Sequence, residues 1–423
     1  MKKNFYLIIL TVFFMTIDCW SAGAQTTDGL SSTPGWYQTL SHDLNFRANV
    51  VGYALFQNVE ESGLNPYNIL GIPQRRLGIE LRPDFSLPLN RLEFGFKPRA
   101  TLYHTHWDDG IYETKRDESD SDVYVNEGLV KLRIADRFFV SAGRENLQWG
   151  PSYLLSPSNP FYQDNGRNNP SLELPGLDYL RAVWIPSLTW TLSGIANIGK
   201  GRADSIRDFK NGYALKLDFT GDEKYFSLIG SCREDEKAEV GFFGGMTLAD
   251  PLLVYTEGSM SAEEEAVDIL VGGAYTLTDG STVSVEYFHH GAGCTKEPIE
   301  SCLISENDYQ NLMNRFSIFT GTIDQLLDEI DNLNLGDQAV SFVRKNYFLL
   351  QYIKPRIRDT LTLTARWICD LDDTSSRAIG MVNYELNNYW EAFAVGNLYL
   401  GGSDIEYGSL LNHSVMMGLI CSF

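Results

Sequence analysis

The chain ends, at residues 413–423, in HSVMMGLICSF, and the alternation in this stretch decides the fold. Val415, Met417, Leu419, Cys421 and Phe423 occupy every second position. Successive side chains of a β-strand point to opposite faces, so one face of such a strand is apolar throughout. The other face carries serine and glycine beside one methionine and one isoleucine. The stretch therefore predicts a strand that lies between an apolar and a more polar environment.

The composition narrows the class of protein. The 423 residues carry 34 Lys and Arg against 55 Asp and Glu, a net charge of −21, with 13% aromatic residues and a mean hydropathy of −0.19. Beyond the N-terminal region no apolar run reaches the roughly 18 residues that a membrane helix needs. A barrel fits, because only alternate residues of its strands touch lipid. A large secreted β-sandwich would alternate too, although it rarely needs so many long strands. The acidic charge predicts no nucleic-acid partner.

Two kinds of connection separate the alternating segments from Asp43 onward. The short ones carry turn residues and lie at 88–91, 135–137, 185–187, 221–223, 249–251, 278–280, 358–359 and 387–388. The longer ones run at about 58–73, 108–120, 149–176, 200–210, 233–237, 260–266, 290–344, 371–376 and 399–408. Because the two kinds alternate strictly, we predict an all-β, transmembrane antiparallel barrel of about 18 strands, with about 16 as the alternative count.

A terminal Phe423 preceded by apolar residues at every second position resembles the closing strand of Gram-negative outer-membrane β-barrels. The resemblance implies a bacterial outer-membrane location, contact with outer-membrane lipid and lipopolysaccharide, and recognition of the C-terminal strand by the barrel-assembly machinery. It names no solute.

The N-terminus predicts export. Lys2 and Lys3 precede the apolar run 5–17, and Ala22, Gly23 and Ala24 supply a cleavage site of small residues. We therefore expect a signal peptide at 1–24, a short periplasmic segment at 25–42 and the barrel at 43–423. The segment 25–42 is too short for the folded plug of an energised importer.

The parity of the apolar side chains predicts which polar residues face the lumen. The pore-lining basic set is Arg47, Arg76, Arg82, Lys97, Arg99, Lys131 and Arg133, joined by Arg144 and Arg181. The pore-lining acidic set is Glu80, Asp84, Glu93 and Glu127. The first seven basic residues against these four acids leave an excess of three positive charges, which predicts a preference for anions. Alternatively, the two sets pair across neighbouring strands, and the lumen then selects weakly.

The long loop at 149–176 is rich in Pro, Gly and Asn, which fixes a loop without a strand. Its Trp-Gly-Pro and Ser-Asn-Pro pieces resemble the Wzi-type capsule-assembly barrels, which are outer-membrane lectins. That resemblance makes Trp149, Asn159, Phe161 and Arg167 candidates for binding carbohydrate. A loop that folds inward and only buttresses the barrel is the alternative.

The segment 291–344 separates two strands by an unusual length. Its apolar residues recur at a helical period, which predicts a helical insert with the members Leu312, Phe316, Phe319, Ile323, Leu326, Leu327, Ile330 and Leu333. Cys294 and Cys302 lie at its root, where an oxidising compartment would let them form a disulfide.

The leading hypothesis is a porin-like channel for small hydrophilic solutes, anionic ones above all. The rival is a barrel that binds surface polysaccharide or oligosaccharides and assembles capsule. We expect no enzymatic activity and no catalytic residues, because no nucleophile arrangement stands out. We also expect no cofactor and no metal site.

Overall fold

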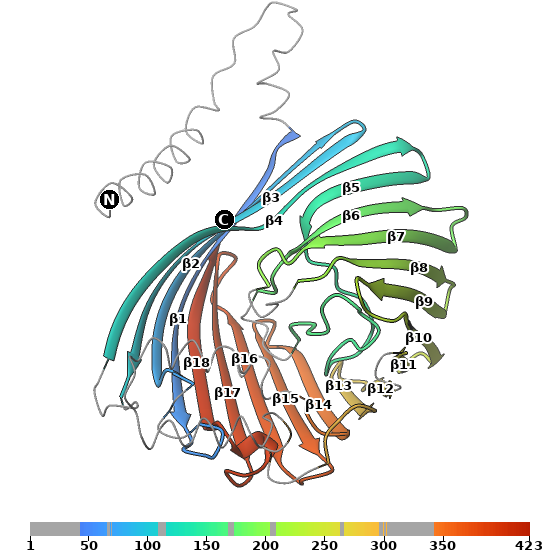
Figure 1. The fold of residues 1–423 in the computed structure, drawn as a ribbon. Helices are drawn as coiled ribbons and strands as arrows, with labels where there is room; N and C mark the ends of the chain where they lie inside the picture. The colour runs from blue at the N-terminus through green and yellow to red at the C-terminus, as the bar shows by residue number, and fades with distance from the viewer. Residues whose placement is uncertain are drawn as a thin grey trace, which may run out of the picture. The chain divides into compact units, whose positions relative to one another are not determined.

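A computed structural model describes residues 43–65, 68, 70–108, 116–167, 173–203, 209–262, 266–295, 299, 302 and 342–423. These residues form one 18-stranded antiparallel sheet (Figure 1). Its strands are β1 (Asn45–Val59), β2 (Arg75–Leu89), β3 (Leu92–Trp107), β4 (Arg116–Ala135), β5 (Phe138–Glu145), β6 (Leu177–Trp184), β7 (Trp190–Gly199), β8 (Gly212–Thr220), β9 (Lys224–Arg233), β10 (Glu239–Ala249), β11 (Leu252–Ser261), β12 (Ala266–Thr276), β13 (Thr282–His290), β14 (Asn346–Ile357), β15 (Leu361–Asp370), β16 (Ser376–Glu385), β17 (Trp390–Leu400) and β18 (Leu411–Ser422). A short 3-10 helix, η2 (Glu406–Gly408), precedes β18.

The sheet closes on itself. Each strand pairs with the next along the chain, and β1 also pairs with β18, from Asn49 opposite Ser422 to Asn58 opposite His413. The all-β barrel predicted from the sequence is therefore confirmed, with 18 strands and not 16.

Short turns gather at one end of the barrel and longer loops at the other, as the sequence predicted. The turn end also holds the start of β1 and the end of β18. The predicted loop at 108–120 is too long, because β4 already begins at Arg116. Asp117 and Ser119 lie within β4, opposite His106 and His104 of β3. Lipid does not constrain a strand beyond the membrane, so charged residues can continue it there.

Exposure confirms the parity of the strands. Leu77 and Ile79 are each 55% exposed on the outer face of β2, whereas Glu80 is 8% exposed toward the inside. On β3 Leu102 is 42% exposed and Arg99 only 3%. Outward side chains are thus apolar and would meet lipid, as transmembrane barrels require.

Inward aromatic rings pack over glycines of the neighbouring strand. Tyr53 of β1 lies opposite Gly78 of β2, and a Cβ on Gly78 would come within 2.5 Å of its ring. Tyr255 of β11 covers Gly272 of β12 in the same way. Only glycine leaves room for these rings to lie flat on the wall.

The core lies inside the barrel, along the later strands. An apolar cluster lines the inner face of β11–β18 and includes Leu270, Leu349, Ile368, Ile379 and Phe393, all of them buried. Leu154 and Leu155 from the loop after β5 belong to this same cluster.

Three predicted segments fall wholly or mostly outside the described residues: the signal peptide at 1–24, the periplasmic segment at 25–42 and the helical period at 312–333. Within the described part of the chain, no helix has the length and apolar character to cross a bilayer.

Candidate functional site: the lumen and its loop

The basic residues predicted to line the pore follow one side of the barrel. Register places Arg76 at the loop end of β2 and Arg82 opposite Asn49, farther toward the turn end. Lys97 and Arg99 continue on β3, and Arg133 lies close to the turn end of β4. We call the inward side chains of β1–β4 the charged wall. It runs along the axis from one end of the barrel to the other.

Most bases of the charged wall are paired with acids. The shortest N–O distances are 2.5 Å from Arg82 to Glu80 and 2.8 Å from Lys97 to Glu127. The Lys131 and Glu93 pair is longer, at 3.4 Å. Each acid of the predicted lining thus lies beside a predicted base, and for Asp84 that base is Arg99.

Arg99 is the most enclosed base of this wall. Its Nη2 lies 2.5 Å from Glu173 and 2.9 Å from Asp84, and its Nη1 donates to the carbonyl of Pro83. Burying the charge of a guanidinium is unfavourable unless carboxylates lie beside it, and two carboxylates lie beside Arg99. Glu173 arrives from the loop after β5, so the loop neutralises part of the wall that it faces.

Three arginines of the charged wall have no carboxylate within ion-pair distance among the residues that the structure describes: Arg47, Arg76 and Arg133. Arg76 lies 5.7 Å from the ring centre of Tyr103, and Arg133 lies at the same distance from that of Phe139. Arg47 is exposed to the lumen.

Arg181 lies on the predicted inner face, whereas Arg144 does not. Arg181 of β6 lies 3.8 Å from Glu145 across β5, and its register partner is Ser141, which faces Lys131. Arg144 instead shares a face with Val130 and Leu132, both exposed outward, and pairs with Asp178 at 2.7 Å. Arg144 therefore belongs to the outer face at the loop end. The sequence prediction was one residue out of register at this position.

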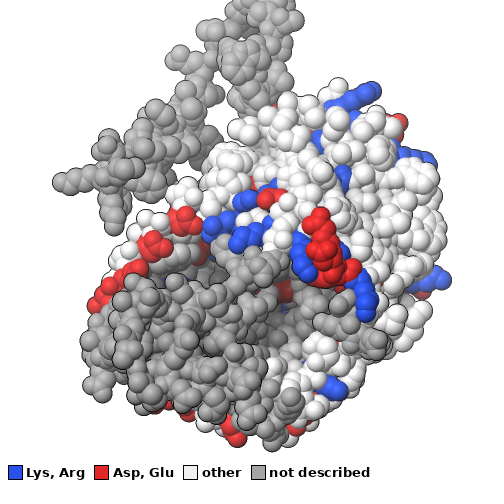
Figure 2. Space-filling model, viewed as in Figure 1, with Lys and Arg blue, Asp and Glu red and all other residues white. Residues whose placement is uncertain are grey.

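The loop between β5 and β6 enters the lumen and contacts strands around it (Figure 1). Its backbone carbonyls accept hydrogen bonds from Asn126 of β4, Arg233 of β9 and Arg366 of β15. Glu173 completes the ring of contacts at Arg99 of β3. In the space-filling view, charged side chains of both signs lie along the upper edge of a hollow (Figure 2). The loop narrows the lumen, and its contacts with β3, β4, β9 and β15 hold it in place.

The four predicted loop candidates use their contacts within the loop and against the wall. Asn159 donates to the carbonyl of Leu147 and accepts from the amide of Phe161. Arg167 donates to the carbonyls of Pro151 and Ser152. The Phe161 ring packs 6.1 Å from Trp149 and 5.3 Å from Tyr179. Their visible role is to shape the loop.

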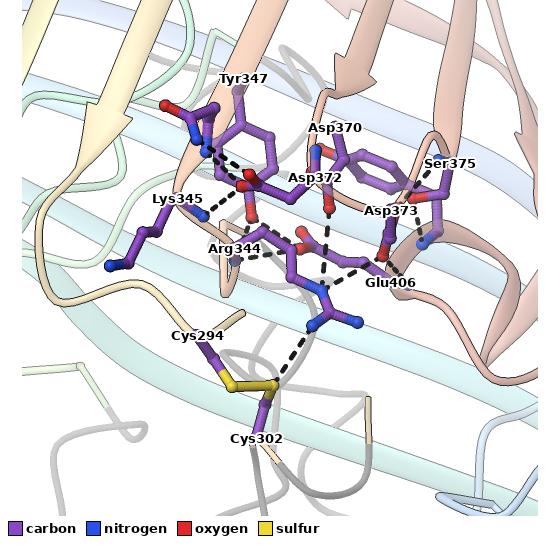
Figure 3. Close-up of polar contacts among 12 residues, drawn as sticks. Cys294, Cys302, Arg344, Lys345, Tyr347, Asp370, Asp372, Asp373, Ser375 and Glu406 are labelled. Atoms are coloured by element: carbon purple, nitrogen blue, oxygen red, sulfur yellow. Dashed lines mark hydrogen bonds and ion pairs between the residues drawn. A yellow bond between two sulfur atoms is a disulfide. The ribbon is translucent and has the colours of Figure 1, made fainter. Parts of the chain in front are cut away.

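A second polar cluster lies at the loop end, where Arg344 is surrounded by carboxylates (Figure 3). Its Nε lies 3.2 Å from Asp373 and 4.0 Å from Asp370, and its backbone amide donates to Glu406. Cys294 and Cys302 form a disulfide, and Arg344 donates to the Cys302 sulfur. The cluster ties three loops of this end together.

Burial raises the pKa of Glu406 to about 7, although the Tyr347 hydroxyl and two backbone amides donate to it. Burial also acts to raise the pKa of Asp373, but hydrogen bonds from Glu406 and Ser375 outweigh it and lower that pKa. Across the described residues, no three His, Cys, Asp or Glu side chains form a cluster suited to a metal ion.

The chain is similar in fold to several solved outer-membrane proteins of Pseudomonas aeruginosa. OccK7 (OpdD) matches with a TM-score of 0.55 at 10% identity, covering 90% of this chain and 99% of that chain. OccK5 (OpdH) gives 0.54 at 8% identity, with 90% and 99% covered, and OprD gives 0.52 at 11% identity, with 90% and 95% covered. No family model and no curated protein matches the sequence. At such low identity the likeness concerns the fold, which is that of a porin-like outer-membrane barrel.

Proposed function

Starting from a porin-like barrel of the bacterial outer membrane, we propose that this protein is a channel for small hydrophilic solutes, that it prefers anions, and that it is not an enzyme. The observation that carries the proposal is the charged wall, which lines the lumen from the loop end to the turn end. Passive passage needs such a polar lining, because a solute must keep partners for its charges and hydroxyls while it moves.

The anion preference rests on a count of charges. The lining predicted from the sequence holds seven bases (Arg47, Arg76, Arg82, Lys97, Arg99, Lys131 and Arg133) and four acids (Glu80, Asp84, Glu93 and Glu127), and the loop adds Glu173. Seven minus five leaves an excess of two positive charges. The unpaired arginines are spread along the axis, so a passing anion meets one near each end of the pore.

The excess charge acts across a narrow lumen because screening is incomplete there. The Debye length is about 8 Å at physiological salt, comparable to the distance across a pore narrowed by a loop. Glu118, Asp120 and Asp122 share the inward parity of β4 nearer its loop end. These acids oppose the preference at the entrance, so the arginines farther in must determine it.

The partners follow from the location. We propose export by the signal peptide at 1–24, insertion by the barrel-assembly machinery through the strand that ends at Phe423, and contact with outer-membrane lipid and lipopolysaccharide. The rival role in capsule assembly rests on Trp149, Asn159, Phe161 and Arg167, whose contacts are made within the loop or with the wall behind it.

Planar-bilayer recording tests the proposal. The purified protein should open ohmic channels, and a KCl gradient should give a reversal potential on the anion side. Changing Arg47, Arg76 and Arg133 together to Gln should move that potential toward cations, whereas Arg358→Gln, in the turn after β14, should leave it unchanged. Cation preference in the native protein would refute the anion preference, and the absence of conductance would refute the channel.

A further inference from the structure

Glu257 of β11 points into the lumen and is fully buried beneath the loop that follows β5. Its carboxylate accepts hydrogen bonds from three serine hydroxyls of that loop: Ser152 at 2.7 Å, Ser156 at 2.5 Å and Ser158 at 2.8 Å. The backbone amide of Ser158 also donates to it, at 3.4 Å. A single carboxylate of β11 thus holds a segment of the loop that carries three serines.

Glu286 of β13 holds the same loop from a neighbouring position. It is also fully buried, and its two oxygens accept the backbone amides of Tyr153, at 2.7 Å, and Leu154, at 3.0 Å. The Tyr255 hydroxyl donates to it as well, at 2.7 Å. The two carboxylates lie on strands separated only by β12, so they contact consecutive residues of the loop.

The loop is shaped to receive Glu257. Gly150 has a φ of +85°, and a Cβ there would collide with both carboxylate oxygens. Among the residues that the structure describes, no Lys or Arg lies within ion-pair distance of Glu257. A buried carboxylate without a cation needs several donors. The loop supplies all the donors that Glu257 has in the described part of the chain.

We propose that Glu257 and Glu286 are the positioning residues of the constriction: they clamp residues 150–158 against the inner wall and so set the conductance of the pore. This inference rests on the channel function proposed above. The apolar contacts of Leu154 and Leu155 fix the loop against the same strands, but the carboxylates decide its register, because hydrogen bonds are directional and apolar contacts are not.

The test compares two variants of the clamp with one matched control. Glu257→Gln weakens the hydrogen bonds on the side of β11. The triple change of Ser152, Ser156 and Ser158 to Ala removes their donors on the side of the loop. Glu391→Gln is the control, since Glu391 also faces inward but bonds Asn383 of the adjacent strand. Two properties are measured: single-channel conductance, and trypsin cleavage after Arg167 in detergent, with heat-modifiable migration reporting the intact barrel.

Both clamp variants should show several-fold faster cleavage after Arg167 and a raised or flickering conductance, with the barrel intact and the control like the native protein. Native cleavage rates and native conductance in both would overturn the proposal. If Glu257→Gln fails to fold, the serine variant decides. If the native protein conducts nothing, the channel function fails, while the cleavage rates still test the clamp.

Discussion

The inner face of the barrel has two sides of opposite chemistry. β1–β4 present paired and unpaired charges, whereas β11–β18, together with Val51 of β1, present a buried apolar cluster that includes Leu349 and Ile368 and is interrupted by the buried Glu257 and Glu286. Both sides obey the same alternation, so the fold alone does not explain the difference. Apolar side chains facing a wet lumen would be unfavourable unless something covers them, and the loop brings Leu154 and Leu155 to them.

The comparison predicts which part of the lumen the solutes of the proposed channel would use. The later strands form a platform on which Leu154 and Leu155 of the loop pack, whereas the loop meets the charged wall through polar contacts at Arg99 and Asn126. For the proposed channel we therefore expect a path off the axis of the barrel, between β1–β4 and the loop. The predictions below test this division, starting with those that affect the whole barrel.

The largest effect is expected where charge meets lipid. Leu102→Arg places a guanidinium on the outer face of β3 and should destabilise the barrel by about 2–4 kcal/mol if it lies near the bilayer midplane. Gln57→Arg, on the inner face of β1, should be tolerated. Unfolding in urea, followed by heat-modifiable migration, measures both. Equal effects would mean that the assignment of inner and outer faces is wrong.

A smaller effect is expected from filling the space beneath an aromatic ring. Gly78→Ala forces a Cβ into the Tyr53 ring and should cost about 1–3 kcal/mol. Gly272→Ala should cost as much beneath Tyr255, although it lies on the later strands. Gly230→Ala is the control, since a Cβ there meets nothing within 4 Å. A cost at only one of the two sites would show that the two sides differ in packing as well as in charge.

The charge of the open side can be changed without touching the barrel. Glu173→Gln removes one of the two carboxylates at Arg99 and should shift the reversal potential toward anions, with conductance nearly unchanged. Glu223→Gln, in the turn after β8, serves as the control. A reversal potential that does not move would show that Arg99 lies away from the ion path.

The loop end should respond to pH through Glu406. Its pKa is about 7 in the folded protein against a usual value of 4.5, so the folded state holds the proton more tightly. The stability that this proton confers is complete below about pH 4.5 and is lost as the pH rises through 7. Protease resistance of the loop 401–410 should fall over that window, and Glu406→Gln should abolish the dependence. A pH dependence that persists in the variant would assign it to the neighbouring Asp370, whose pKa burial raises to about 8.

The sequence predicted the strands and the turns well because lipid imposes strict alternation and short turns need specific residues. It failed at the start of β4, where the strand leaves the lipid and alternation no longer matters. Parity also predicted inward positions for many charged residues of β1–β4, but it left out Glu118, Asp120 and Asp122 of β4, and it could not predict the partners that come from the loop. Glu173 is 74 positions from Arg99, and Ser156 is 101 from Glu257, and no local pattern reports such contacts.

The pairing of β1 with β18 also has a consequence for assembly. Ala48 and Phe423 exchange backbone hydrogen bonds in both directions, so the two strands that close the sheet come from opposite ends of the chain. Bringing such distant segments together carries the largest loop-closure entropy in the barrel, and we expect this seam to form last. Until it does, the growing sheet exposes two unpaired edges, each a template for another strand. Protection of these edges is thus a requirement of the topology itself, whatever solute the finished barrel carries.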